Sequence, residues 1–142
     1  MKPSNVQDSR RAFLKVATSS SVATALAVLA FGCGFGRIDV ETVAKRMIEA
    51  LNHPHRAREI GAAYIARTPG LETQSYEILT RNLLATLSIK FDEISHDTLD
   101  SLAMLLHDKV RQDFLDENVV VVEGFMLSRT EAMLCSLASV YA

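Results

Sequence analysis

Apolar residues recur at helical spacing along residues 37–142. The first apolar stripe begins directly after Asp39 and runs from residue 40 to about 51. The second begins after Pro54 and ends at the Thr-Pro-Gly run at 68–70. Apolar positions at i, i+3, i+4 and i+7 make one face of a helix apolar. Aspartate is a favoured N-cap, and proline is favoured in the first helical turn. The pattern therefore predicts two amphipathic helices joined by a short break.

Two more helices are predicted in the middle of this part, one from about 72 to 87 and one from 96 to about 115 with Ser95 as its N-cap. Each carries an apolar stripe expected to face the core. The stripes consist of Tyr76, Leu79, Leu83, Leu84 and Leu87 on the first helix, and Leu99, Leu102, Ala103, Leu106, Val110 and Phe114 on the second.

The one β-like stretch is the run of four valines at 119–122. It predicts a short hairpin with residues 125–127. Ser128 followed by Glu131 then forms a capping box, which begins a helix over 129–141 that is apolar on most sides. Such a helix lies in the centre of a core or under a partner. We expect a mainly α fold, a small orthogonal bundle of four to five helices with at most a short hairpin near 119–127.

The first 36 residues differ from the rest and are predicted to form a separate N-terminal signal or anchor helix. Residues 1–15 are basic, and residues 16–36 carry no charge. The run Ser9-Arg10-Arg11-Ala12-Phe13-Leu14-Lys15 resembles the twin-arginine (Tat) export signal at every defined position. The resemblance implies recognition by the Tat translocase and export to the periplasm.

Three fates of this segment remain open after export. A signal peptidase could cleave it at one of several small residues. Ala30-Phe31-Gly32-Cys33 is similar to a lipoprotein box, which would lipidate Cys33. Residues 13–36 could also stay in the inner membrane as an anchor, since the 21 uncharged residues span about 30 Å as a helix. The last two fates place the domain at the periplasmic face of the inner membrane.

Charge narrows the range of partners. The 142-residue chain has a net charge of −2, but residues 37–142 hold 11 Lys and Arg against 16 Asp and Glu, a net charge of −5. An acidic domain is poorly suited to phosphate backbones or to anionic lipid headgroups, so we expect no nucleic-acid partner. The two cysteines are too few for a disulfide scaffold.

Candidate chemistry is sparse, and we predict no catalytic residue and no cofactor. Imidazoles at His53, His55, His96 and His107 are candidate ligands for a metal ion. Cys135 has apolar neighbours and is expected to be buried and unreactive. Asp113 projects toward the apolar face of its helix. We expect it to be structural, either paired with Arg111 or Arg129 or capping a turn.

In layout, the chain resembles the small Tat-signal subunits of membrane-bound flavin dehydrogenases such as gluconate 2-dehydrogenase. The resemblance covers the signal and the size of the domain. It implies a non-catalytic accessory subunit or escort of a larger oxidoreductase subunit, with partner contacts expected at Phe125, Met126 and Leu127. The alternatives are a stand-alone periplasmic metal or haem binder that uses its histidines, and a small enzyme with an unrecognised site.

Overall fold

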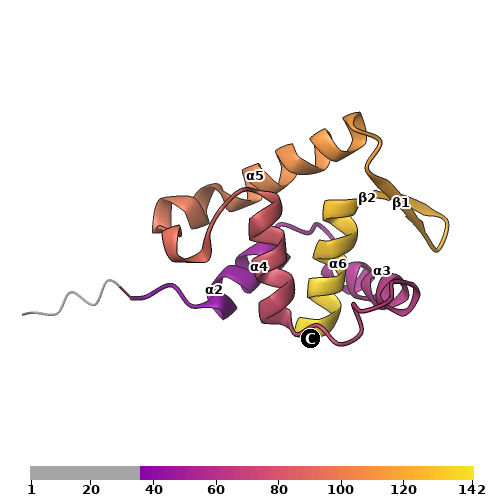
Figure 1. Ribbon diagram of the computed structural model, residues 1–142, viewed down its shortest axis with the longest axis horizontal. Helices are drawn as coiled ribbons and strands as arrows, with labels where there is room; N and C mark the ends of the chain where they lie inside the picture. The colour runs from indigo at the N-terminus through magenta and orange to yellow at the C-terminus, as the bar shows by residue number, and fades with distance from the viewer. Residues whose placement is uncertain (1–35) are drawn as a thin grey trace, which may run out of the picture. The chain divides into compact units, whose positions relative to one another are not determined.

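A computed structural model describes residues 36–142 of the chain. The predictions for the Tat motif at 9–15, for Cys33 and for an N-terminal signal or anchor helix lie outside these residues. The described part is mainly helical with one short antiparallel hairpin, as predicted (Figure 1). Its elements are the helices α2 (Val40–Glu49), α3 (Pro54–Arg67), α4 (Tyr76–Thr86), η1 (Phe91–Glu93), α5 (His96–Leu115) and α6 (Arg129–Tyr141), and the strands β1 (Val119–Val122) and β2 (Phe125–Ser128).

The helices begin at the residues whose side chains cap them. Asp39 accepts a hydrogen bond from the Thr42 N–H at 2.7 Å, which starts α2. Ser95 starts α5, and Ser128 exchanges hydrogen bonds with Glu131 in a capping box that starts α6. These bonds satisfy N–H groups that a helix leaves free in its first turn, which is why the predicted starts are confirmed.

The predicted start of α4 near residue 72 is wrong, because the helix begins at Tyr76. Gly70 has a left-handed φ of +86°. Its N–H donates to the Glu72 carboxylate at 2.9 Å, and its carbonyl accepts from the Thr73 hydroxyl at 3.2 Å. These local bonds fold the residues after Gly70 into a turn that competes with a helix. The 3₁₀ turn η1 was also not predicted.

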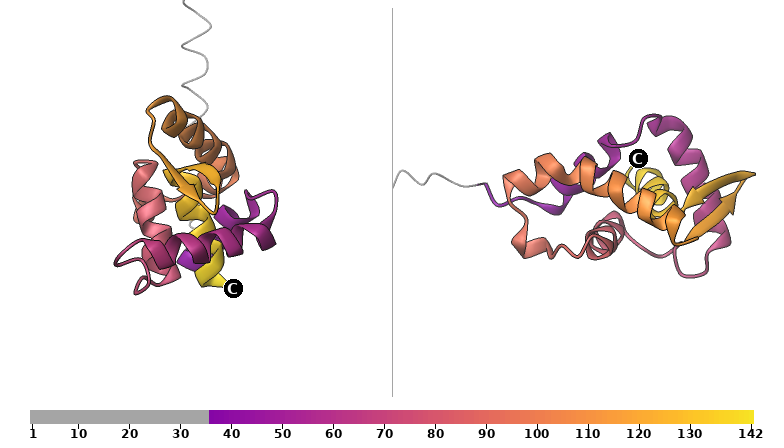
Figure 2. Two further views of the ribbon diagram at one scale, coloured as in Figure 1. Left: turned by 90° about the vertical axis from the view of Figure 1, so that its right-hand side faces the viewer. Right: turned by 90° about the horizontal axis from the view of Figure 1, so that it is seen from above.

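Helix α6 forms the centre of the domain. It contacts α2, α3, α4, α5 and both strands, and Figures 1 and 2 show it between α4 and α3. Its buried apolar side chains are Ala132, Leu134, Cys135, Leu137 and Ala138. A helix covered on so many sides needs apolar residues around most of its circumference, so the interpretation of residues 129–141 as a central helix is confirmed.

Two members of the predicted apolar stripe of α5 lie at the surface instead. Ala103 and Phe114 are exposed, whereas Leu99, Leu102 and Leu106 are buried. The inward position next to Phe114 is occupied by Asp113, and successive residues of a helix point about 100° apart. Phe114 is therefore directed away from the core. None of the helices among residues 36–142 is both long and apolar enough to cross a membrane.

The hairpin pairs Val119 with Ser128 and Val122 with Phe125, so β2 extends one residue beyond the predicted 125–127. Its two-residue turn places Glu123 at φ +49° and Gly124 at φ +82°. Positive φ at both positions is typical of the turn that matches the twist of a hairpin. The hairpin extends from the end of the domain at which α3 lies (Figures 1 and 2).

Candidate functional site

A cavity of about 310 Å³ opens between the α2–α3 connection, α3, α5, β2 and α6. Its walls are mainly apolar, and Cys135 belongs to its lining. Four residues with titratable side chains also line it, namely His53, Arg56, His107 and Glu131. An apolar hollow with a few convergent polar groups is the usual form of a small-molecule site.

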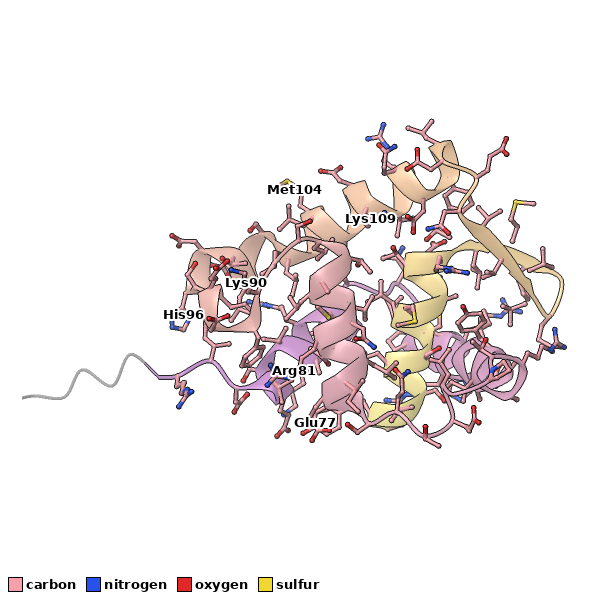
Figure 3. The ribbon with its side chains drawn as sticks, in the orientation of Figure 1. Glu77, Arg81, Lys90, His96, Met104 and Lys109 are labelled. Atoms are coloured by element: carbon pink, nitrogen blue, oxygen red, sulfur yellow. The ribbon has the colours of Figure 1, made fainter. Side chains whose placement is uncertain are left out.

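The structure brings two of the four candidate histidines to this cavity. His53 and His107 line it from the start of α3 and the middle of α5. His55 instead lies 3.7 Å from Glu59, beside a neighbouring hollow. His96 lies at the start of α5, at the opposite end of the domain from α3 (Figure 3), and borders a third hollow. Within residues 36–142, no group of three or more His, Cys, Asp or Glu side chains is placed to hold a metal ion.

Arg56 is the permanently charged cation of the cavity lining. Its guanidinium lies 5.7 Å from the centre of the Phe125 ring. That separation is within the range of a cation–π contact, which holds the guanidinium beside β2. The cationic group thereby stays close to apolar wall residues of the cavity.

Cys135 is buried, with 4% of its surface exposed. Burial raises the pKa of its thiol to about 11, and the nearby Glu131 carboxylate acts in the same direction. The thiolate is the reactive form of cysteine, so the thiol is held in its unreactive form at neutral pH. The prediction that Cys135 is buried is confirmed, and its lack of reactivity stays a prediction.

Asp113 is 1% exposed and accepts four hydrogen bonds. The donors are the Lys109 ammonium at 2.6 Å, the Asn118 amide at 3.2 Å, and the Thr130 hydroxyl and N–H at 2.6 and 3.0 Å. Burial alone would raise the pKa of Asp113, but these hydrogen bonds outweigh it and lower the pKa to about 2. A carboxyl group with so low a pKa stays ionised near neutral pH, so it is not suited to act as a general acid there.

The structural role predicted for Asp113 agrees with these contacts, but the predicted partners Arg111 and Arg129 are wrong. Lys109 lies four residues earlier, on the same side of α5, whereas a residue two positions away faces elsewhere. Thr130 is in the first turn of α6, whose free N–H groups favour an anion. Asp113 therefore joins the end of α5 to the start of α6.

The predicted partner residues of the hairpin divide between two environments. Met126 is 62% exposed, Leu127 is half-buried, and Phe125 lines the cavity under Arg56. Met126 pairs across the hairpin with Val121, which is 63% exposed. Val121 was not among the predicted partner residues, although residues directly opposite each other in a hairpin lie on the same face of it. The outer apolar face of the hairpin is therefore formed by Val121 and Met126.

Comparison of the chain with models of protein families, with curated proteins and with solved structures finds no match. Three features of the described part bear on its function: the cavity, the Asp113 network and the outer face of the hairpin.

Proposed function

We propose that the chain is a Tat-exported, non-catalytic accessory subunit that escorts a larger oxidoreductase subunit to the periplasm. The observation that carries the proposal is the run from Ser9 to Lys15, followed by 21 uncharged residues. The resemblance to Tat signals implies a passenger that crosses the membrane already folded. A small domain with a central helix and capped helix starts is compatible with such a passenger.

The outer face of the hairpin supports the proposal of a partner. Val121 and Met126 expose apolar side chains next to each other on an element that extends from the helices. Apolar and methionine side chains at such positions are typical of protein-binding surfaces. The acidic charge of residues 37–142 favours a protein over a nucleic acid at this surface.

Export is tested by replacing Arg10 and Arg11 together with lysine. The precursor should then accumulate inside the cell, because the Tat signal is defined by the guanidinium pair. Arg37→Lys is the matched control, since it makes the same exchange at the other end of the uncharged run. Equal export of the unchanged chain in cells that lack the Tat translocase would contradict the proposal.

The escort role is tested by purifying the exported protein and asking which protein accompanies it. We expect a stoichiometric partner whose absorption spectrum shows a redox cofactor. Met126→Ser should reduce its recovery about tenfold or more, because an apolar interface residue is lost. Met104→Ser is the matched control, because Met104 lies on α5 (Figure 3) and has a similar exposed fraction of 61%. A histidine-dependent metal or Soret signal from a protein without a partner would favour the stand-alone binder instead.

A further inference from the structure

We propose that the cavity between α3, α5 and α6 binds a small amphipathic carboxylate. The apolar part of this ligand would lie against Ile60, Leu106 and Leu134, and its carboxylate would lie at Arg56. This inference does not depend on the proposed escort function, because it concerns a different surface from Val121 and Met126.

The cavity has the size of a ligand pocket and rigid walls. Its volume of about 310 Å³ is at the small end of ligand pockets, which span roughly 300–1,000 Å³. Leu106 and Leu134 are buried core residues on two helices that pack against each other. A wall made of core side chains keeps its shape without a ligand, so binding costs little reorganisation.

The interior of the cavity is apolar. Among the described residues, every buried side-chain nitrogen or oxygen has a hydrogen-bond partner. The deep wall of the cavity therefore offers no unsatisfied polar side chain to a ligand. A polar group placed there would lose its hydrogen bonds to water without replacement. The part of the ligand that enters must be a hydrocarbon chain or ring.

The charged groups of the lining favour an anionic ligand. Arg56 has no carboxylate within ion-pair distance among residues 36–142. The two imidazoles of His53 and His107 are further potential donors. The acid of the lining, Glu131, already accepts the Ser128 N–H at 3.0 Å within the capping box. An otherwise acidic domain thus presents a guanidinium here, whose planar fork matches a carboxylate.

The start of α3 adds to this preference. His53 makes no side-chain cap hydrogen bond, and the first turn of α3 has no acidic residue. Both His53 and Arg56 line the cavity, so the positive end of the helix lies at the same place as the guanidinium. These features together select an anionic head group over a cationic or neutral one.

The test measures binding of octanoate to the exported protein by titration calorimetry, with octylammonium and octanol as probes of the same chain length. We expect saturable 1:1 binding of octanoate and binding about tenfold or more weaker for the other two probes. Arg56→Gln should weaken octanoate binding about tenfold or more, whereas Arg58→Gln should leave it unchanged. Arg58 is exposed on the same helix and does not line the cavity.

A second variant distinguishes octanoate bound inside the cavity from octanoate that is merely attracted to the charged surface. Ala103 is exposed and lines the cavity, so Ala103→Phe should fill the opening and abolish octanoate binding while the melting temperature stays close to that of the unchanged protein. The proposal would be overturned by the absence of saturable octanoate binding, by equal binding of all three probes, or by unchanged affinity in Ala103→Phe. Loss of a protein partner in Ala103→Phe without any carboxylate binding would assign the cavity to a protein segment and would also overturn it.

Discussion

Gly61 in α3 lies directly against the main chain of Cys135 in α6, so closely that a β-carbon on Gly61 would be 2.0 Å from the Cys135 carbonyl oxygen. The next nearest atoms, the Cys135 carbonyl carbon and the Ser136 nitrogen, would be 2.3 and 2.8 Å away. All three are backbone atoms of a central helix and cannot rotate aside. The absence of a side chain at Gly61 is therefore what lets α3 approach α6.

Gly61→Ala should destabilise the domain by about 3 kcal/mol or more, because α3 and α6 must separate to admit the methyl group. Helix propensity alone would stabilise the variant by about 1 kcal/mol, so the two effects have opposite signs. Urea unfolding followed by circular dichroism measures the difference. Ala62→Gly, at an exposed position of α3, is the control and should cost only about 1 kcal/mol. A Gly61→Ala protein as stable as the unchanged one would refute the tight contact.

Much of the fold could be predicted from local patterns. Asp39, Ser95 and Ser128 cap the predicted helices, and four valines form the predicted strand. The turn after Gly70 was missed because it is held by hydrogen bonds between side chains and backbone, which the spacing of apolar residues does not report. The role of Gly61 was missed for a related reason, since helical spacing shows which face is inward but not how closely two backbones approach.

Asp113→Ala should destabilise the domain by about 3 kcal/mol, because it leaves the Thr130 hydroxyl and N–H without their acceptor in a buried place. Thr130→Val should cost about 1–2 kcal/mol, since the N–H donor remains. Asp108→Ala is the matched control: Asp108 is an exposed acid on the same helix and should change stability by less than about 0.5 kcal/mol. Chemical denaturation of the three variants tests this order, and equal losses for Asp113 and Asp108 would contradict it.

Lowering the pH should destabilise the domain through the Asp113 carboxylate. The pKa of Asp113 in the folded protein is about 2, below its ordinary value of 3.8, so the folded state favours the ionised form. Ionised Asp113 therefore contributes about 2 kcal/mol to the free energy of unfolding. This contribution is complete above about pH 4 and is lost as the pH falls through 2. Unfolding free energies measured between pH 6 and 2 should therefore fall more steeply for the unchanged protein than for Asp113→Asn. Parallel curves would show that Asp113 does not carry this dependence.

The candidate site was less predictable than the fold. His53 and His107 lie 54 positions apart in the sequence and meet at one cavity only because α3 and α5 both flank α6. Helical spacing relates residues of one helix to one another, so it could not single out this pair among the four candidate histidines. The partner of Asp113 was missed similarly, because Thr130 lies beyond the hairpin and its proximity depends on how the hairpin returns the chain to α5.

Cys135 should react with a thiol reagent only when the domain unfolds. In a Cys33→Ser chain it is the sole thiol, since the sequence has two cysteines. It is nearly inaccessible, and a pKa of about 11 leaves on the order of one thiolate in a thousand at pH 8. Labelling by an aromatic disulfide should therefore be at least about 100-fold slower in buffer than in concentrated guanidinium. Stoichiometric labelling of the folded protein at the rate of a free cysteine would contradict the burial.

The same labelling also tests the contact of α3 with α6, because Gly61→Ala pushes on the main chain of Cys135 itself. That variant should therefore be labelled faster than the Ala62→Gly control. The difference between the two rates would locate the loosening at the contact of α3 with α6.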